Sequence, residues 1–379
     1  MNRFISGELF SGSGPIPFGS ILLFDSYWFC NLNQLEKNRP IAVISDSKFV
    51  FSHVSSFLQR IDIPIHFVNR QKFNELKRSK WITIDIYNDA VLTETVQQQE
   101  LPILEKELYV SDRKIEILTS LKGEDIQDSF FCGADGVGLI STEFLFYDYP
   151  HLTEEIHYSV LDKIFANNPT QDYTIRLFDI NFDKLPKWVD RYGYKYDDRY
   201  RGIHLLFEQN YQELLRLQIA AIAKLSKKYS VSLLIPYIGN CEDILTVKKI
   251  IDSFGTEKIQ IGGMIETCAA VYEMEEMSEL LDFFSIGSND FVQSFFGVDR
   301  TNILDLNKVN LKNKDFWRYF ATILTNAKGK DVRICGQLPI LPGMLSKLID
   351  MGYSKFTVSP YFVQHLKRII DGKGAAEKC

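Results

Sequence analysis

The chain has 379 residues, of which 45% are hydrophobic and 24% charged, the balance of a globular protein with a large core. Its net charge of −6 argues against nucleic acid as the main partner, because a phosphate backbone requires a clustered positive face. The sequence has no run of about 18 apolar residues and no secretory signal at its start. Six cysteines are scattered without a C-x-x-C pair. We therefore expect a cytoplasmic protein with no membrane contact, no zinc site and no disulfides.

The first part of the chain, residues 1–93, predicts a small α/β domain. A short helix is expected over residues 53–60, and β-branched or aromatic runs predict strands at 20–24, 41–45, 65–68 and 81–85. The following stretch, residues 94–113, is rich in Glu and Gln and predicts a solvated linker helix interrupted near Pro102.

From residue 114 onward, short apolar runs alternate with longer amphipathic stretches, including helices expected at 212–227 and 315–326. This alternation favours a parallel sheet, and its extent over residues 114–371 fits one closed (β/α)8 barrel. The small, charged tail at 372–379 predicts disorder. The eight expected strands are 115–121, 137–140, 173–178, 231–236, 259–265, 283–286, 332–334 and 356–358.

Polar residues follow these strands at their C-terminal ends, where a barrel carries its active site. Each residue alone has an ordinary structural explanation, such as a helix cap, a surface arginine or a buried cysteine. Their position on one predicted rim favours a shared function. The set comprises Arg176, Asp179, Arg201, Glu266, Asn289, Asp290, Arg300, Cys335 and Gln337.

The chemistry of this set suits a small, multiply charged anion bound with Mg²⁺. Two carboxylates, Glu266 and Asp290, are suitable ligands for a hard cation that keeps several waters. The three arginines provide forked donors for phosphate and carboxylate oxygens. Cys335 places a thiol where it can give or take a proton.

Several motifs resemble those of phosphoenolpyruvate-utilising enzymes, and most closely Enzyme I of the sugar phosphotransferase system. They are G-A-D-G-V-G-L-I-S-T-E-F-L-F at 133–146, G-M-I-E-T at 263–267, D-F-F-S-I-G-S-N-D at 282–290, V-D-R at 298–300 and C-G-Q at 335–337. Residues 5–19 resemble the opening strand of Enzyme I, and Ser52-His53 resembles its phosphorylated-histidine stretch. The resemblance implies a C-terminal TIM-like barrel with a small swivelling phosphohistidine domain, without the HPr-binding insertion. It also implies a homodimer formed through the barrel.

By this resemblance, phosphoenolpyruvate (PEP) is the substrate, and Arg176, Arg201, Asn289 and Arg300 bind it. Glu266 and Asp290 are implied ligands of Mg²⁺. The phosphoryl group is expected to move to His53 and then to an unknown acceptor protein or small molecule. Cys335 is expected to protonate the enolate to pyruvate.

Three departures from the family pattern bear on this expectation. Ser141 stands where family members carry arginine, and Gln337 stands where they carry glutamate. Residues 48–51, Lys-Phe-Val-Phe, replace the usual Gly-Gly-Arg-Thr before the histidine. Two alternatives to a phosphotransferase of a specialised pathway therefore stay open. One is an enzyme that uses the enolate or a substrate analogue without a phosphohistidine, and the other is a catalytically weakened PEP sensor.

Overall fold

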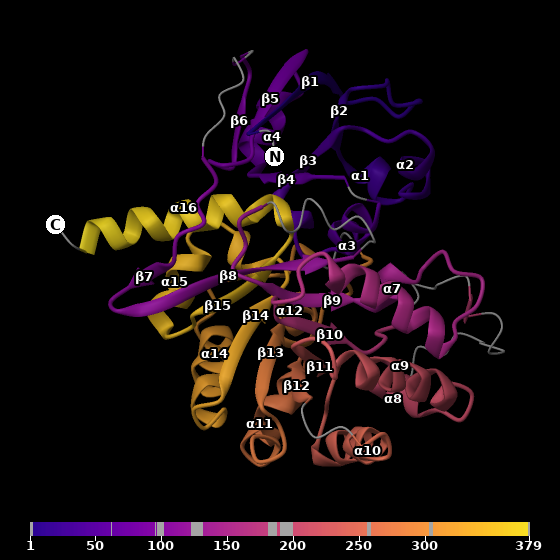
Figure 1. Cartoon of the computed structure of the whole chain (residues 1–379). Coiled ribbons are helices and arrows are strands. Elements are labelled where there is room, and N and C mark those ends of the chain that lie inside the picture. Colours follow the sequence, from indigo (N-terminus) through magenta and orange to yellow (C-terminus); the bar gives the residue numbers. More distant parts are fainter. Residues whose placement is uncertain are drawn as a thin grey trace.

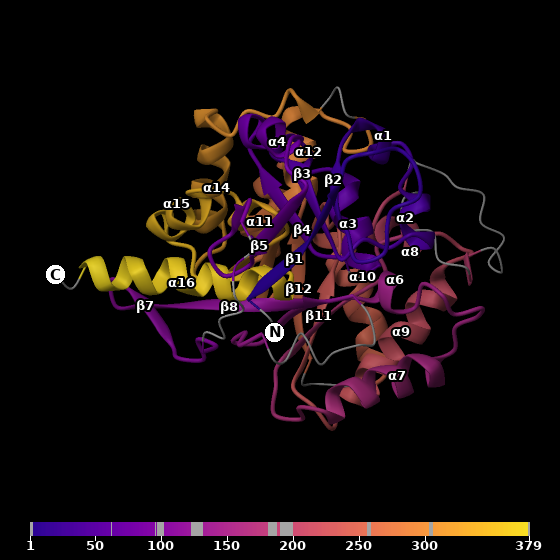
Figure 2. The ribbon, with the colours of Figure 1, turned by 90° about the horizontal axis from the view of Figure 1, so that it is seen from above.

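The computed structural model describes residues 3–61, 63–94, 96, 102–122, 132–180, 188–189, 200–255, 259–302 and 306–377. They form a small N-terminal sheet domain that lies against one end of a larger barrel (Figure 1). Figure 2 shows the same arrangement from above, with the N-terminal elements lying over the barrel. In the described residues, no helix is long and apolar enough to cross a membrane.

The N-terminal domain is a six-stranded mixed sheet of order β4-β3-β2-β1-β5-β6. Its strands are β1 (Phe4–Phe10), β2 (Ile21–Phe24), β3 (Ala42–Asp46), β4 (Ile65–Val68), β5 (Trp81–Asp85) and β6 (Ala90–Leu92). Its helices are α1 (Ser26–Phe29), α2 (Asn33–Lys37), α3 (His53–Arg60) and α4 (Arg70–Leu76), with a 3-10 turn η1 (Ser47–Phe49). The four strands and the helix at 53–60 that the sequence predicted are present, each within a residue or so of its expected bounds.

The barrel is closed by eight parallel strands, since the last strand, β15, pairs with the first, β8. The strands are β8 (Arg113–Leu121), β9 (Val137–Ser141), β10 (Tyr173–Arg176), β11 (Val231–Ile235), β12 (Gln260–Ile265), β13 (Phe283–Gly287), β14 (Asp331–Cys335) and β15 (Lys355–Val358). All of them coincide with predicted strands, which confirms the barrel prediction. The strand expected at 173–178 ends two residues early, at Arg176.

Helices surround the barrel and bury apolar faces on it. They are α6 (Thr142–Leu145), α7 (Glu154–Ala166), α8 (Ile203–Phe207), α9 (Gln212–Leu225), α10 (Cys241–Asp252), α11 (Cys268–Met277), α12 (Ser288–Phe296), α14 (Lys314–Asn326), α15 (Met344–Met351) and α16 (Pro360–Glu377), with a 3-10 turn η4 (Leu338–Ile340). The predicted helices at 212–227 and 315–326 correspond to α9 and α14.

Two local predictions were wrong. The linker helix expected at 94–113 is absent from the described residues 102–112, where β7 (Leu108–Val110) instead forms a hairpin with β8; residues 95 and 97–101 lie outside the description. Ser111 and Asp112 have φ of 47° and 62°, as a tight hairpin turn requires, and tertiary pairing overrides the local helix preference. The tail expected to be disordered continues α16 to Glu377, while residues 378–379 lie outside the description.

The two units share apolar contacts. Val50 and Phe51, which directly precede α3, belong to the core cluster of the barrel, and each is only 3% exposed. Leu306 makes the reverse contact, because this barrel-side residue packs into the core of the N-terminal domain. The start of α3 is thereby held at the barrel rim.

Candidate active site

The C-terminal strand ends surround a cavity that opens to solvent. Eight residues were given a catalytic, substrate-binding or metal-binding role from the sequence, and six of them line the cavity: Arg176, Glu266, Asn289, Asp290, Arg300 and Cys335. Arg201 bonds to Asp290 at the same rim, and His53 lies against the backbone of Arg300. The structure therefore brings all eight together.

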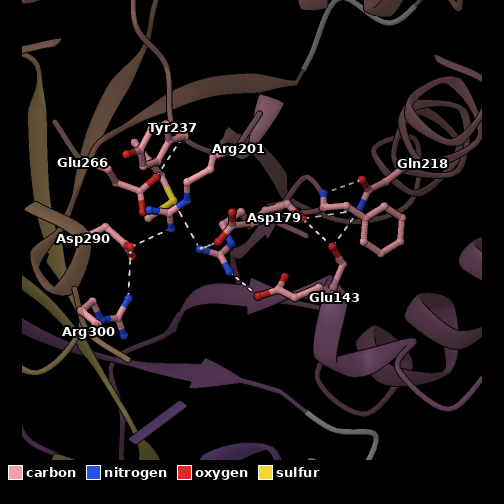
Figure 3. Close-up of polar contacts among 12 residues, drawn as sticks. Glu143, Asp179, Arg201, Gln218, Tyr237, Glu266, Asp290 and Arg300 are labelled. Carbon is pink, nitrogen blue, oxygen red and sulfur yellow. Dashed lines mark hydrogen bonds and ion pairs between the residues drawn. The ribbon is translucent and has the colours of Figure 1, made fainter. Parts of the chain in front are cut away.

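Asp290 lies at the centre of the charged network, in the first turn of α12 directly after β13. Its Oδ1 accepts from Arg201 Nη2 at 2.9 Å and from Arg300 Nη1 at 3.1 Å (Figure 3). The Arg201 guanidinium also lies over the Tyr237 ring, 4.7 Å from its centroid. Burial opposes the charge on Arg201, but the Asp290 carboxylate outweighs this effect and raises the pKa of the guanidinium.

Glu266 directly follows β12 and lines the cavity as a buried residue, at 2% exposure. Its Oε2 accepts from the backbone N–H of Tyr237 at 2.8 Å. Burial, followed by the nearby carboxylates of Asp290 and Asp179, holds the pKa of Glu266 well above its usual range. A β-carbon on Gly287 would lie 2.6 Å from Glu266 Oε1, so glycine is required for this close approach.

Arg176 ends β10 and forms a second charged group. Its Nη2 donates to Glu143 Oε1, and its Nη1 lies 3.3 Å from Asp179 Oδ2. Glu143 and Asp179 outweigh the effect of burial and raise the pKa of the guanidinium. In the described part of the chain, the buried Nε atoms of Arg176 and Arg201 have no hydrogen-bond partner. Buried donors of this kind suit a site that receives an anion.

A buried glutamine on α9 holds the backbone beneath Arg176. Gln218 Nε2 donates to Thr142 Oγ1 at 2.9 Å, and its Oε1 accepts from the Phe178 N–H at 2.9 Å. Thr142 Oγ1 in turn donates to the Arg176 carbonyl at 2.8 Å. These bonds fix the end of β10 relative to the start of α6, and with it the Arg176–Glu143 pair (Figure 3).

The last residue of β14, Cys335, places its thiol in the cavity wall. Cys335 Sγ donates to the Ile286 carbonyl at 3.4 Å, and burial, followed by the charge of Glu266, raises the pKa of the thiol to about 11. Asn289 Oδ1 accepts from the Gln337 N–H at 3.0 Å. Gly336 has a φ of 99°, and a β-carbon there would lie 2.6 Å from Ser288 Oγ. The turn therefore depends on glycine.

His53 begins α3 and contacts the barrel through Arg300. Its Nδ1 lies 3.3 Å from the Arg300 carbonyl oxygen, which can only accept, so Nδ1 carries the hydrogen in this contact. The Arg300 Nε donates to the Phe51 carbonyl at 2.7 Å. The Phe29 ring packs edge-on against the imidazole, with centroids 5.0 Å apart. One arginine thus joins Asp290 to the histidine segment.

Residues 97–373 match the model of a known family, described as PEP-utilising enzyme, PEP-binding domain. This match covers well over half of the chain. The chain belongs to the PEP-utilising enzyme family.

Individual relatives of this PEP-utilising protein are distant. It is 25% identical to a phosphoenolpyruvate-protein phosphotransferase of Haemophilus influenzae over 94% of the chain and 68% of the relative. It is 28% identical to Multiphosphoryl transfer protein 2 of Escherichia coli over 72% of the chain and 34% of the relative. A phosphoenolpyruvate-protein phosphotransferase of Buchnera aphidicola subsp. Baizongia pistaciae is 24% identical over 89% of the chain and 64% of the relative. The PEP-utilising protein therefore spans about two thirds or less of these relatives.

Four residues of the PEP-utilising protein's site were missed as functional candidates from the sequence. Glu143 stands in the T-E-F-L-F motif directly after a strand end, which was a usable signal. Gln218 lies among apolar residues in L-R-L-Q-I-A-A-I, a pattern that predicts a buried amide. Tyr237 has a φ of 54°, which no sequence pattern indicated. Lys122 lines the cavity just beyond the end of β8, and nothing marked it in advance.

Proposed function

We propose that this protein is a PEP-dependent phosphotransferase that transfers the phosphoryl group of PEP to His53, and onward to an acceptor, with release of pyruvate. The contact of His53 with Arg300 carries this proposal. The same arginine reaches Asp290 at the cavity, so the imidazole of His53 and the anion site are joined by one residue. The relatives named as phosphoenolpyruvate-protein phosphotransferases support the same reaction class.

The cavity is suited to an anion such as PEP. Arg176 and Arg300 line it directly, and Arg201 adjoins it through Asp290. Guanidinium groups bind carboxylate and phosphate oxygens with two parallel donors. The buried Nε atoms of Arg176 and Arg201 add donors that the described residues leave without an acceptor.

Glu266 and Asp290 fit a Mg²⁺ site. No group of three or more His, Cys, Asp or Glu side chains suited to a metal occurs among the described residues, so the protein would supply only a few ligands. Mg²⁺ accepts such sites, because it keeps waters and bonds to substrate phosphates. The raised pKa of Glu266 beside Asp290 and Asp179 indicates crowded negative charge that a dication would relieve. When bound, Mg²⁺ would supply positive charge to the substrate's phosphate and enol oxygens.

The tautomer of His53 suits the transfer. With the hydrogen on Nδ1 directed at the Arg300 carbonyl, the lone pair lies on Nε2. The bond between phosphorus and the enol oxygen breaks as a bond from phosphorus to Nε2 forms. The enol oxygen keeps the electron pair, which gives the enolate of pyruvate. The arginines stabilise the charge on the phosphoryl oxygens during this step.

Cys335 is placed to complete the reaction. Its thiol lines the cavity at 5% exposure. We propose that it gives its proton to the methylene carbon of the enolate, which yields pyruvate and a thiolate that water reprotonates. Asn289 fixes the turn that follows the thiol through its bond to the Gln337 N–H.

The test is incubation of the full chain with PEP labelled in the phosphoryl group and with Mg²⁺, followed by mapping of the phosphorylated residue. We expect label on His53 with one pyruvate released per label, and no label in His53→Ala. The exposed His151→Ala is the matched control and should label like the unmodified protein. Tight PEP binding without label on His53 would overturn the relay and leave direct enolate chemistry or PEP sensing.

A further inference from the structure

We propose that Lys122 is a substrate-binding residue that replaces the arginine missing at Ser141. This inference rests on the proposed function, because it assigns Lys122 to an anionic oxygen of bound PEP. Both residues line the cavity. Lys122 directly follows β8, and Ser141 ends the adjacent strand β9.

The register of the two strands places these residues side by side. Ser120 pairs with Leu139 and Leu121 with Ile140, so the next position along β8 faces the next along β9. These positions are Lys122 and Ser141. A lysine side chain is long enough to bring its ammonium group to the space that an arginine on the neighbouring strand would occupy.

The ring of Phe144, three residues after Ser141, also holds the Lys122 side chain at this place. Lys122 Nζ lies over the Phe144 ring, 5.2 Å from its centroid. A cation–π contact orients an ammonium group while leaving it charged. Phe144 is itself buried at 7% exposure and lines the same cavity, so it is a firm support.

The charge balance of the rim explains why this cation matters. Arg176 lies between the carboxylates of Glu143 and Asp179. Arg201 and Arg300 share the carboxylate of Asp290. Each of the three guanidinium groups thus already contacts a carboxylate. PEP carries negative charge on its phosphate and on its carboxylate, and Lys122 in the cavity wall offers a further cation to these oxygens.

Residues with hydroxyl side chains line the cavity together with Lys122. Ser120 lies on β8, two residues before Lys122. Thr357 on β15 and Ser359 just after it line the cavity from the strand paired with β8 on its other side. Hydroxyl groups on both sides of a lysine suit an oxyanion, because they donate hydrogen bonds to oxygens that the single ammonium does not reach.

The experiment measures PEP binding by calorimetry with Mg²⁺ on four full-length variants. Lys122→Met keeps the apolar stem without the charge, and we expect its PEP dissociation constant to rise about tenfold to hundredfold. Lys122→Arg should retain most of the affinity. The double variant Lys122→Met with Ser141→Arg should recover it, because the cation returns from the neighbouring strand. A structural role for Lys122 would not produce this recovery.

The matched control is Lys330→Met, an exposed lysine that precedes β14 at the opposite end of the barrel and should bind PEP normally. Unchanged PEP affinity in Lys122→Met, beside an unmodified protein that binds PEP, would overturn the inference and leave the proposed function standing. Absence of PEP binding by the unmodified protein would overturn both. Weaker binding in Lys122→Met without recovery in the double variant would overturn the replacement of the missing arginine. Oxalate binding then distinguishes the two ends of PEP: a loss shared with oxalate assigns Lys122 to the carboxylate, and a loss confined to PEP assigns it to the phosphate.

Discussion

The barrel rim and the segment before His53 meet at Arg300, yet different forces hold them in place. The rim is fixed by charge: Arg176 pairs with Glu143, and Asp290 receives two arginines. The segment before His53 is fixed by burial, since Val50 and Phe51 lie in the barrel core. Two polar bonds across this contact end on backbone carbonyls, one of Arg300 and one of Phe51.

This difference separates two tasks. Ion pairs and hydrogen bonds are directional, so they set the positions of groups that must meet a substrate. Apolar burial is not directional, and each buried side chain contributes about 1.5–3 kcal/mol to keeping two surfaces together. The change from Gly-Gly-Arg-Thr to Lys-Phe-Val-Phe at 48–51 thus exchanges a small, polar segment for an apolar anchor. The histidine segment is placed by its core contacts, while the rim is placed by its charges.

The apolar anchor can be weakened by a substitution that leaves the charged residues of the rim unchanged. Phe51→Ala should lower the free energy of unfolding by about 3–5 kcal/mol. It should also slow PEP-dependent labelling of His53 while leaving PEP affinity unchanged, because the histidine spends less time at the cavity. Denaturant unfolding, label incorporation and calorimetry measure the three effects.

Phe73→Ala is the control for this variant. Phe73 packs in a core cluster of the N-terminal domain that does not include Phe51. It should destabilise the protein without slowing the labelling of folded molecules. Equal slowing in both variants, or a loss of PEP affinity in Phe51→Ala, would show that Phe51 is not the anchor.

The charged rim can be altered in turn. Glu266→Gln should reduce PEP-dependent pyruvate release on the order of 10²–10³-fold, because it removes one carboxylate from the proposed metal site. The Mg²⁺ concentration needed for half-maximal rate should rise, and chelation of Mg²⁺ should abolish activity in the unmodified protein. Glu213→Gln, at an exposed position of α9, is the control. An unchanged Mg²⁺ requirement in Glu266→Gln would remove this residue from the metal site.

A buried histidine on α7 should make the stability of the protein depend on pH. His157 on α7 is fully buried against Phe146 and Phe178, and burial lowers its pKa from 6.5 to about 4. The folded state therefore keeps the His157 ring neutral. The free energy of unfolding is at its full value above pH 6.5 and decreases as the pH falls toward 4, because the unfolded chain takes up a proton that the buried ring does not. The full effect is about 3 kcal/mol in the free energy of unfolding.

His157→Phe should flatten the dependence of the unfolding free energy on pH between 6.5 and 4, measured by urea titrations. His151→Gln, which changes an exposed histidine, should keep the slope of the unmodified protein. The same slope in His157→Phe would contradict the assignment.

The smallest expected effect tests how closely the rim is packed. Gly287→Ala would place a β-carbon 2.6 Å from Glu266 Oε1, so the carboxylate must shift. We expect a loss of about 1–3 kcal/mol in stability and a weaker affinity for PEP with Mg²⁺. Gly14→Ala meets no atom within 4 Å and should change neither quantity. Calorimetry and thermal unfolding of both variants make the comparison.

The barrel and its rim were predictable from sequence because their signals are local and repeated. Each strand is a short apolar run, and the topology of a parallel barrel brings the residues after every strand to one end. Arg176, Glu266 and Asp290 could therefore be grouped although they lie far apart in the chain. Their bonding partners could not be foreseen to the same degree.

The misses depend on packing between distant segments. The sequence around Gln218 signals a buried amide, but its bonding partners become known only when the end of β10 is placed against it. Lys122 becomes notable only when the register sets it beside Ser141. The Glu- and Gln-rich stretch before β8 has helical composition, yet Leu108–Val110 pairs with the following strand. Local preference was outweighed in each case by a partner elsewhere in the fold.

Arg300 has a consequence for how the site registers its occupant. Its side chain reaches Asp290 and the Phe51 carbonyl, while its own carbonyl receives the imidazole hydrogen of His53. An anion that draws the guanidinium away from Asp290 pulls on the same residue whose backbone selects the tautomer of the histidine. Occupancy of the cavity and the orientation of His53 are therefore coupled through one residue: a substitution of Arg300 would remove the side-chain bonds to Asp290 and to the Phe51 carbonyl and leave the backbone carbonyl that faces His53.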